Sequence, residues 1–348
     1  MKKAAALILT VTVLLFNTGC RNNSLKKFEG YTFDYFDTVT TVVGYANSKA
    51  EFDEVFGEIK KEIEMYHKLF DIYNTYEDTV NIADINALYG GKHKIQKVDK
   101  KVIDFILFSK DMYTKTMGKT NIAMGSVLSI WHKYREEGNK NPESAKLPDI
   151  SELKSAAEHT DIENITVDEK NCTVFLADDK MLLDVGAVAK GYTAEKICEF
   201  IKLKNLSGYI VNLGGNVKAV GTHPNGEKFS VGIENPNTDD TEKPFIEQLY
   251  LNNTALVTSG SYQRYYTVNG KNYNHIINPD TLFPGENFLS VSVISENSGL
   301  ADALSTALFS MSFEKGLALV NSLPNTEALW VLKNENIEYS ANFKDFCF

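Results

Sequence analysis

The chain has 348 residues, a length that allows one large domain or two ordinary ones. Hydrophobic residues make up 43% of the chain and charged residues 24%, which is the composition of a soluble globular protein with a sizeable core. The formal net charge of −10 argues against nucleic acid as the main partner, because neutralising phosphates requires a basic surface. It does not exclude a small phosphate-bearing ligand, since one lysine and a divalent cation can outweigh a diffuse negative charge.

The first twenty residues are predicted to be an export signal rather than part of the fold. Two lysines precede an apolar run at 4–16, which is short for a membrane span. The run leads to Gly19-Cys20, which resembles a bacterial lipoprotein cleavage site with Cys20 as the lipidated residue. Asn17 stands where such sites usually carry Leu, so plain secretion or an uncleaved anchor is the alternative.

This leader predicts the domain organisation and the location of the protein. We expect a signal peptide at 1–20, a flexible tether at 21–30 and a single domain at 31–348. The protein is expected to be exported, and either lipid-anchored to the outer face of the cytoplasmic membrane or periplasmic.

Hydrophobic periodicity predicts strands interrupted by long single helices. In the first half of the chain the predicted elements are a strand at 31–46, helices at 52–71 and 100–114, a surface loop or lid at 138–150, strands at 166–176 and 181–184, and a helix at 191–204. In the second half they are strands at 209–213, 217–220, 229–234, 246–251, 255–259, 265–268, 273–277 and 289–294, a helix at 299–323, and a hairpin of 327–332 with 337–340. This order predicts an α+β fold with mixed, largely antiparallel β-structure.

Residues 184–192 read Asp-Val-Gly-Ala-Val-Ala-Lys-Gly-Tyr and join a short apolar run to a predicted helix. Such a turn can direct backbone N–H groups, a helix N-terminus and the cationic Lys190 at one anion. Asp184 beside that anion requires a hydrogen bond from a ligand or a balancing cation. The alternative is a plain strand-to-helix connector, in which Gly186 and Gly191 allow a tight turn and Lys190 is solvated.

Residues 301–307, Ala-Asp-Ala-Leu-Ser-Thr-Ala, lie in the predicted late helix. Asp302 and Thr306 are four residues apart and therefore share one helix face. A carboxylate and a hydroxyl placed in this way can supply two hard oxygens to Mg²⁺ or Ca²⁺, with water and substrate phosphate as further ligands. The alternative is that Asp302 caps the helix and Thr306 hydrogen-bonds to its own turn.

His275 is predicted to stand at a strand end, shortly before the turn at Asn278-Pro279. A histidine in this place can act as a base toward a hydroxyl or, as an imidazolium, bind a phosphate. The alternative is a histidine that is hydrogen-bonded within its own loop.

Taken in order, eight segments resemble the ApbE family, the FAD:protein FMN transferases, from about residue 31 to residue 332. The matching segments are 36–38, 70–74, 121–131, 184–192, 211–215, 258–265, 275–281 and 301–307. The departures from the family pattern are Phe36-Asp37 for Met-Gly, Asn121 and Asn278 for a frequent Asp, and Leu282 for a frequent Gly. These departures keep the spacing, so they bear on ligand detail more than on family membership.

The resemblance implies a groove for FAD with a metal ion beside the diphosphate. Aromatic residues such as Phe36 and Tyr73 would stack on a flat ring system. The residues implied to contact FAD are Phe36, Tyr73, Lys119, Thr120, Asn121, Asp184, Lys190, His275 and Ile276. The implied ligands of Mg²⁺ are the Ala187 carbonyl, the Asp302 carboxylate and the Thr306 hydroxyl, with Ser305 as a further candidate.

The resemblance also implies a reaction, in which a threonine or serine hydroxyl of a partner flavoprotein attacks the FMN phosphorus and expels AMP. Mg²⁺ and Lys190 would neutralise the charge that grows on the bridging oxygen. His275 is the candidate base, so His275, Lys190 and Asp302 are the implied catalytic residues. By family analogy, the acceptors would be respiratory or electron-transfer flavoproteins at the outer face of the membrane.

Two other functions fit the same residues. An FAD pyrophosphatase would use water in place of the protein hydroxyl and release FMN and AMP. A lipid-tethered FAD-binding protein would hold the ligand without turnover, an outcome that the retained Asp302, Thr306, Lys190 and His275 disfavour.

Overall fold

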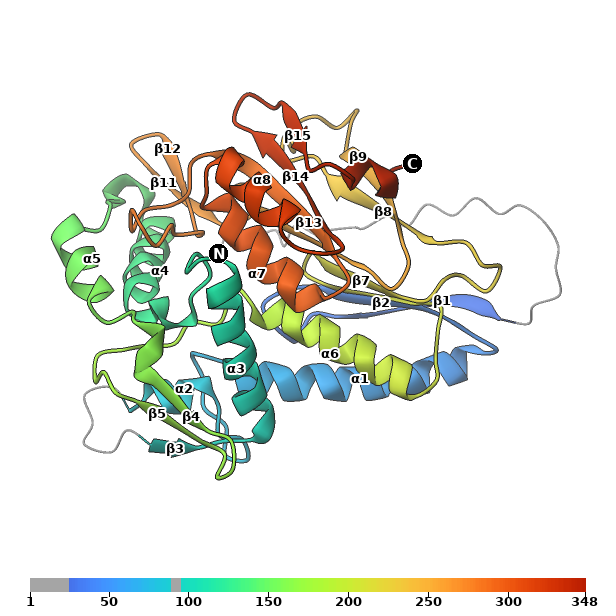
Figure 1. The fold of residues 1–348 in the computed structure, drawn as a ribbon, viewed down its shortest axis with the longest axis horizontal. Helices are drawn as coiled ribbons and strands as arrows, with labels where there is room; N and C mark the ends of the chain where they lie inside the picture. Colours follow the sequence, from blue (N-terminus) through green and yellow to red (C-terminus); the bar gives the residue numbers. More distant parts are fainter. Residues whose placement is uncertain (1–24, 89–94) are drawn as a thin grey trace.

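The computed structural model describes residues 25–88 and 95–348, and its main feature is an antiparallel sheet with long helices along one face (Figure 1). The predicted signal peptide and Cys20 lie outside the described residues. In the part of the chain that is described, no helix combines the length and the apolar character needed to cross a membrane.

The described residues confirm the predicted α+β class. The helices are α1 (Lys49–Phe70), α2 (Ile82–Asn86), α3 (Lys100–Lys115), α4 (Gly125–Lys140), α5 (Ile150–Ala157), α6 (Ala189–Leu203), α7 (Ser298–Phe309) and α8 (Phe313–Asn321). Short 3₁₀ turns are η1 (Ile122–Met124), η2 (Pro142–Ser144), η3 (Ile162–Asn164) and η4 (Phe343–Phe346). The strands are β1 (Lys26–Thr32), β2 (Thr40–Ala46), β3 (Ile95–Lys97), β4 (Ile165–Asp168), β5 (Thr173–Leu176), β6 (Tyr209–Leu213), β7 (Asn216–Val220), β8 (Phe229–Glu234), β9 (Phe245–Leu251), β10 (Ala255–Gly260), β11 (Tyr265–Val268), β12 (Lys271–Asn274), β13 (Phe288–Ser295), β14 (Thr326–Leu332) and β15 (Ile337–Tyr339).

The large sheet has the strand order β1-β2-β6-β7-β10-β13-β14-β15, and each neighbouring pair is antiparallel. Successive side chains of a strand point to opposite faces. Val42 accordingly packs with residues of α1 and α6, whereas Val43 packs with the β8–β9 hairpin on the other face. Because both faces are covered, β6 is buried along its whole length.

A second group of elements lies beside the sheet, on the left of Figure 1. It contains α2 to α5, the small sheet β3-β5-β4 and the hairpin β11–β12. The hairpin packs on α4, where the rings of Tyr266 and Trp131 meet edge to face at 6.5 Å. Apolar residues on either side of Asp184, including Leu183 and Val185, are buried against α3 and its neighbours, so the candidate turn is held by this group.

The N-terminal prediction needs correction, because the sheet begins earlier than residue 31. The predicted strand at 31–46 is two strands, and β1 pairs with β2 from Lys26 onward, so the second half of the predicted tether is part of the sheet. The ring of Phe28 lies 5.8 Å from that of Phe52 on α1, which gives this segment an apolar contact. Phe36 and Asp37 have φ values of 56° and 49°, a conformation that ends the extended run between the strands.

Three further boundaries differ from the predicted ones. The helix predicted at 299–323 is interrupted after Phe309, and the hydroxyl of Ser312 caps α8 by accepting from the Lys315 N–H at 3.4 Å. The predicted strand at 166–176 is the β4–β5 hairpin, whose turn places Cys172 at φ 52°. In the predicted loop at 138–150, α4 continues as far as Lys140.

The segment predicted as a strand at 181–184 is extended but joins no sheet. Its backbone pairs with the η1–α4 junction, where the Gly125 N–H donates to the Leu182 carbonyl at 3.0 Å. The Asp184 N–H donates to the Ile122 carbonyl at 2.8 Å in the same way. The predicted hairpin near the C-terminus is confirmed as β14 and β15.

The contact between α6 and α7 leaves no room for a side chain at position 191. A Cβ on Gly191 would lie 2.4 Å from the Asp302 Cβ and 2.5 Å from the Ser298 carbonyl oxygen. Neither neighbour can move away as the end of a flexible side chain could, so the glycine is required by the close approach of the two helices.

We predict that Gly191→Ala lowers the free energy of unfolding by about 2 kcal/mol or more, because the added methyl group overpacks a buried contact. Gly57→Ala is the matched control, since a Cβ there meets nothing within 4 Å and α1 gains a better helix former. This control should raise the free energy of unfolding by about 0.5–1 kcal/mol. Urea unfolding followed by circular dichroism measures both changes, and equal stability of the two variants would contradict the packing argument.

Candidate active site

One hydrogen bond joins the two sequence segments that were predicted to share a site. The Gly191 N–H, in the first turn of α6, donates to the Asp302 carboxylate Oδ2 on α7 at 2.7 Å. Asp302 is 4% exposed, so this bond is made in the interior. The segment 184–192 and the segment 301–307 therefore meet in the structure.

The Ala187 carbonyl, close to this bond in the sequence, has no hydrogen-bond donor. Ala187 lies just before Val188, the N-cap residue of α6, so its carbonyl is outside the hydrogen-bond pattern of the helix. Two other carbonyls of the turn are used: Val185 accepts from Val188 at 3.0 Å, and Val188 accepts from Tyr192 at 3.0 Å. Within residues 25–88 and 95–348, no hydrogen bond is donated to the carbonyl of Ala187, a half-buried residue. A carbonyl oxygen without a donor fits a hard cation.

A cation bound beside the Asp302 carboxylate would stabilise its negative charge. Burial raises the pKa of its carboxyl above the usual range, while Lys190, the Gly191 N–H and Asn216 oppose this shift. A cation beside the carboxylate would stabilise the charged form further. A buried carboxylate next to a carbonyl without a donor thus fits the predicted Mg²⁺ ligands, which stay a prediction.

The two hydroxyl candidates differ in how they are used. The Ser305 Oγ is fully buried, donates to the Asp302 carbonyl at 3.0 Å and lies 2.8 Å from the Ser259 Oγ on β10. The Thr306 hydroxyl is half-buried, and its hydrogen-bonding contact is the same Ser259 Oγ at 3.5 Å. Thr306 is therefore the freer of the two for a ligand, while Ser305 holds α7 against β10.

Side-chain clusters of the usual metal-binding types are absent from the described residues, where no three His, Cys, Asp or Glu side chains are grouped to hold an ion. The predicted set depends instead on one carboxylate, one hydroxyl and one backbone carbonyl. Such mixed oxygen ligands suit Mg²⁺, which keeps several waters and uses substrate phosphates as ligands.

Asp184 is held by its own turn. Its Oδ1 accepts from the Gly186 N–H at 2.9 Å, so the carboxylate is folded back over the start of the turn. Burial raises the pKa of this carboxyl, and the Gly186 N–H and the neighbouring His132 and Arg135 on α4 act in the opposite direction. The side chain thus lies between the turn and α4.

His275 follows β12 and is bound to the preceding loop. Its N–H donates to the Arg264 carbonyl at 3.1 Å, and its Nδ1 lies 3.2 Å from the same oxygen. Burial and the positive charges of Arg264, Arg135 and Lys190 lower the pKa of the imidazole to about 4. The ring is therefore neutral at pH 7, and a proton on Nδ1 directed at the carbonyl leaves Nε2 as the basic atom. The adjoining Ile276 is buried in the core.

Two arginines near His275 were not assigned a role from the sequence. Arg135 on α4 places its Nη2 2.9 Å from the His132 Nδ1, and the Arg264 Nη2 donates to the Asp37 carbonyl at 3.2 Å. The rarity of arginine in this chain could have drawn attention to them. Of the 36 lysines and arginines only three are arginines, at 21, 135 and 264. Both add positive charge beside the candidate base.

The two aromatic candidates differ in exposure. Tyr73 is 63% exposed, and its ring centroid lies 5.3 Å from that of His132, so one end of the candidate site carries an open aromatic surface. Phe36 is partly buried, with its ring edge to face with His67 at 5.4 Å. Tyr73 is thus the better placed of the two for stacking on a flat ligand.

The side chains at 119–121 are already occupied. Lys119 pairs with Asp280, and the Thr120 hydroxyl donates to the Ala303 carbonyl at 2.6 Å. Asn121 caps η1 by accepting from a backbone N–H two residues on. A ligand at this segment would therefore meet mainly its backbone.

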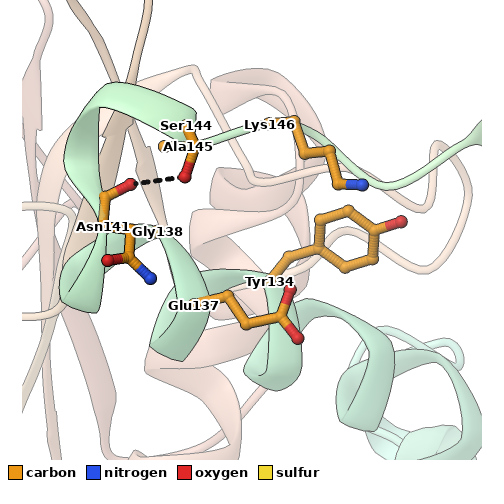
Figure 2. A pocket seen from close by; sticks show the side chains of 7 residues that line it. All are labelled: Tyr134, Glu137, Gly138, Asn141, Ser144, Ala145 and Lys146. Carbon is orange, nitrogen blue, oxygen red and sulfur yellow. Dashed lines mark hydrogen bonds between the residues drawn. The ribbon is translucent and has the colours of Figure 1, made fainter.

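Two cavities lie beside α4. The cavity in Figure 2 has a volume of about 310 Å³ and is lined by Tyr134, Glu137, Gly138, Asn141, Ser144, Ala145 and Lys146. It contains none of the predicted site residues. The other has a volume of about 520 Å³ and is lined by Arg135, Asn139, Tyr262, Gln263, Arg264 and Tyr265. This second cavity includes both arginines near His275 and adjoins the candidate site.

Comparison with known proteins gives relatives over most of the chain. A protein of Klebsiella pneumoniae named FAD:protein FMN transferase is 31% identical over 282 residues, which cover 79% of this chain and 84% of that protein. A protein of Treponema pallidum with the same name is 29% identical over 313 residues, covering 86% of this chain and 83% of that protein.

Solved structures show the same fold. The crystal structure of the ApbE protein of Thermotoga maritima matches with a TM-score of 0.79 and 28% identity, covering 92% of this chain and 99% of that chain. The flavin transferase ApbE of Vibrio cholerae matches with a TM-score of 0.75 and 20% identity over 92% of this chain and 99% of its own. A family model described as the ApbE family matches residues 36–330. The chain belongs to the ApbE family.

Proposed function

We propose that this chain transfers the FMN moiety of FAD to a threonine or serine hydroxyl of an exported flavoprotein and releases AMP, with Mg²⁺ required. The observation that carries the proposal is the Gly191–Asp302 hydrogen bond, which joins α7 to the turn that carries Lys190 and the Ala187 carbonyl. The names of the relatives from Klebsiella pneumoniae and Treponema pallidum support the same reaction.

The charge distribution of the site suits the departure of AMP. The bond that breaks joins the FMN phosphorus to the bridging oxygen, which takes the electron pair and becomes part of the AMP phosphate. Lys190, whose charge acts on both Asp302 and His275, would face that oxygen. Mg²⁺ held by Ala187, Asp302 and Thr306 would neutralise charge on the diphosphate.

The acceptor side of the reaction depends on His275. The new bond joins the acceptor hydroxyl oxygen to the FMN phosphorus, and the hydroxyl proton must leave as it forms. The neutral imidazole can take that proton at Nε2, while the Arg264 carbonyl fixes the ring through Nδ1. Arg135 and Arg264 would then oppose the build-up of imidazolium, so His275 has to pass the proton on.

The acceptor and the location belong to the same proposal. The export signal at 1–20 would place the site outside the cytoplasm, and lipid on Cys20 would hold it at the membrane, where exported flavoproteins are within reach. Because β1 starts at Lys26, only residues 21–25 of the sequence separate Cys20 from the sheet.

The function is tested with the protein that lacks residues 1–20. It is incubated with FAD, Mg²⁺ and a fragment of an exported flavoprotein that carries an acceptor threonine. We expect the mass of the fragment to increase by that of an FMN group, with one AMP released for each fragment modified. Release of AMP without the mass increase would show a pyrophosphatase, and absence of both would show a binding protein.

We predict that Asp302→Asn lowers Mg²⁺-dependent transfer by about 100-fold or more, since it removes the only carboxylate among the proposed metal ligands. The asparagine oxygen can still accept from the Gly191 N–H, so the fold should survive. Asp53→Asn, at an exposed ion pair of α1, is the control and should transfer at the normal rate. Full activity of Asp302→Asn at limiting Mg²⁺ would rule out the metal assignment.

We predict that the rate shows no titration of His275 near pH 6.5, because the pKa of its imidazole is lowered to about 4. The neutral form is the base, so the contribution of His275 is complete at neutral pH and is lost as the pH falls through about 4. His275→Gln should lower transfer by about 100-fold at pH 7. A pH–rate profile with circular dichroism as a control for acid unfolding checks this, and a limb at pH 6–7 that disappears in His275→Gln would contradict it.

A further inference from the structure

A buried ion pair lies one helical turn beyond the Gly191–Asp302 contact. Lys218 on β7 is 1% exposed, and its Nζ hydrogen-bonds to both carboxylate oxygens of Glu195 on α6. The same Nζ donates to the Glu296 carbonyl at 2.7 Å, in the turn that precedes α7. One lysine therefore links the central sheet, α6 and the start of α7.

Glu195 makes the link to α7 direct. Its Oε2 accepts from the Ser298 N–H at 2.7 Å, and Ser298 is the first residue of α7. The N–H groups at a helix start have no partner within the helix, and a carboxylate there is favoured by the helix dipole. Glu195 thus fixes the position of the first turn of α7 from a neighbouring helix.

The Gly191–Asp302 and Glu195–Ser298 hydrogen bonds join α6 to α7 at two neighbouring helical turns. Gly191 and Glu195 are four residues apart on α6, and Ser298 and Asp302 are four residues apart on α7. Residues with this spacing lie one above the other on a helix face. Gly191 bonds to Asp302 and Glu195 bonds to Ser298, so the two cross-links are one turn apart and set both the distance and the register of the helices.

Stability by itself does not explain the choice of residues. Removing the charges of a lysine and a glutamate from water costs free energy. Apolar residues of similar size at a buried ion-pair position often give a folded protein that is equally stable or more stable. A directed pair of charges differs from apolar packing because its hydrogen bonds allow only one register. In this chain, that register decides where Asp302 lies relative to the Ala187 carbonyl.

We propose that Lys218 and Glu195 are positioning residues that hold α7 in register with α6. In that register the Asp302 carboxylate accepts from the Gly191 N–H and stays at the turn that carries the Ala187 carbonyl, so that both oxygens can serve the metal ion. The inference rests on the proposed function for its catalytic meaning. Its structural part, the register of the two helices, can be measured without any turnover.

The test compares two variants with a matched control. The double variant Glu195→Leu with Lys218→Met replaces the buried pair by apolar side chains and removes the acceptor of the Ser298 N–H. The single variant Glu195→Asp keeps the charges but shortens the side chain that reaches α7. The control is Glu58→Gln with Lys204→Met, which removes an exposed pair between α1 and α6 whose charged atoms are 2.7 Å apart.

Hydrogen exchange of the segments 186–192 and 298–306 is the first readout, measured at a temperature where each protein is folded. We expect exchange at least tenfold faster in both Glu195 variants and unchanged in the control. The second readout is the Mg²⁺ concentration for half-maximal AMP release from FAD, which should rise at least tenfold in the Glu195 variants. Lower unfolding stability with unchanged exchange and Mg²⁺ requirement would overturn the inference, because the pair would then be merely structural.

The outcomes separate this inference from the proposed function. If the wild-type chain neither transfers FMN nor releases AMP, the proposed function fails, and hydrogen exchange still decides whether the pair sets the register. If the double variant does not fold, Glu195→Asp decides in the same way. Normal exchange in folded Glu195→Asp would then count against the positioning role.

Discussion

The candidate site depends on the contact at which the Gly191 N–H donates to the buried Asp302 carboxylate. It brings α7 to the turn that carries Ala187, whose carbonyl accepts no hydrogen bond from the described residues. It forms only because residue 191 has no side chain, which lets the two helices approach closely. A packing constraint and a ligand position therefore arise from the same glycine.

The surroundings of this contact bring positive and negative charges together. Lys190, Arg135 and Arg264, together with burial, keep the imidazole of His275 neutral, and Lys190 and Arg135 also act on the Asp302 and Asp184 carboxylates. Asp302 is buried and Asp184 is half-buried, and burial raises the pKa of both carboxyl groups. The cationic side chains of such a site would be stabilised by the phosphate groups of a ligand, and its carboxylates by a divalent cation. A nucleotide diphosphate with its metal ion carries both.

The departures from the family pattern have a structural explanation in two places. Asp37 and Leu282 stand where family members have or often have glycine, and both adopt positive φ, at 49° and 62°. The backbone conformation that favours glycine is thus kept although the glycine is not. The Asp37 carbonyl accepts from Arg264 in this conformation, so the strained turn is tied to the loop to which the candidate base His275 hydrogen-bonds.

The sequence by itself determined the fold class, most of the element order and the candidate residues, because periodicity and short motifs such as 184–192 and 301–307 are local. It misplaced the start of β1 and joined α7 to α8, since an edge strand and a capped break depend on what they pack against. Only the tertiary structure decided that Gly191 meets Asp302, that Glu195 reaches Ser298 and that Arg135 lies near His275. These are contacts between distant segments, and their geometry is set by packing rather than by local sequence.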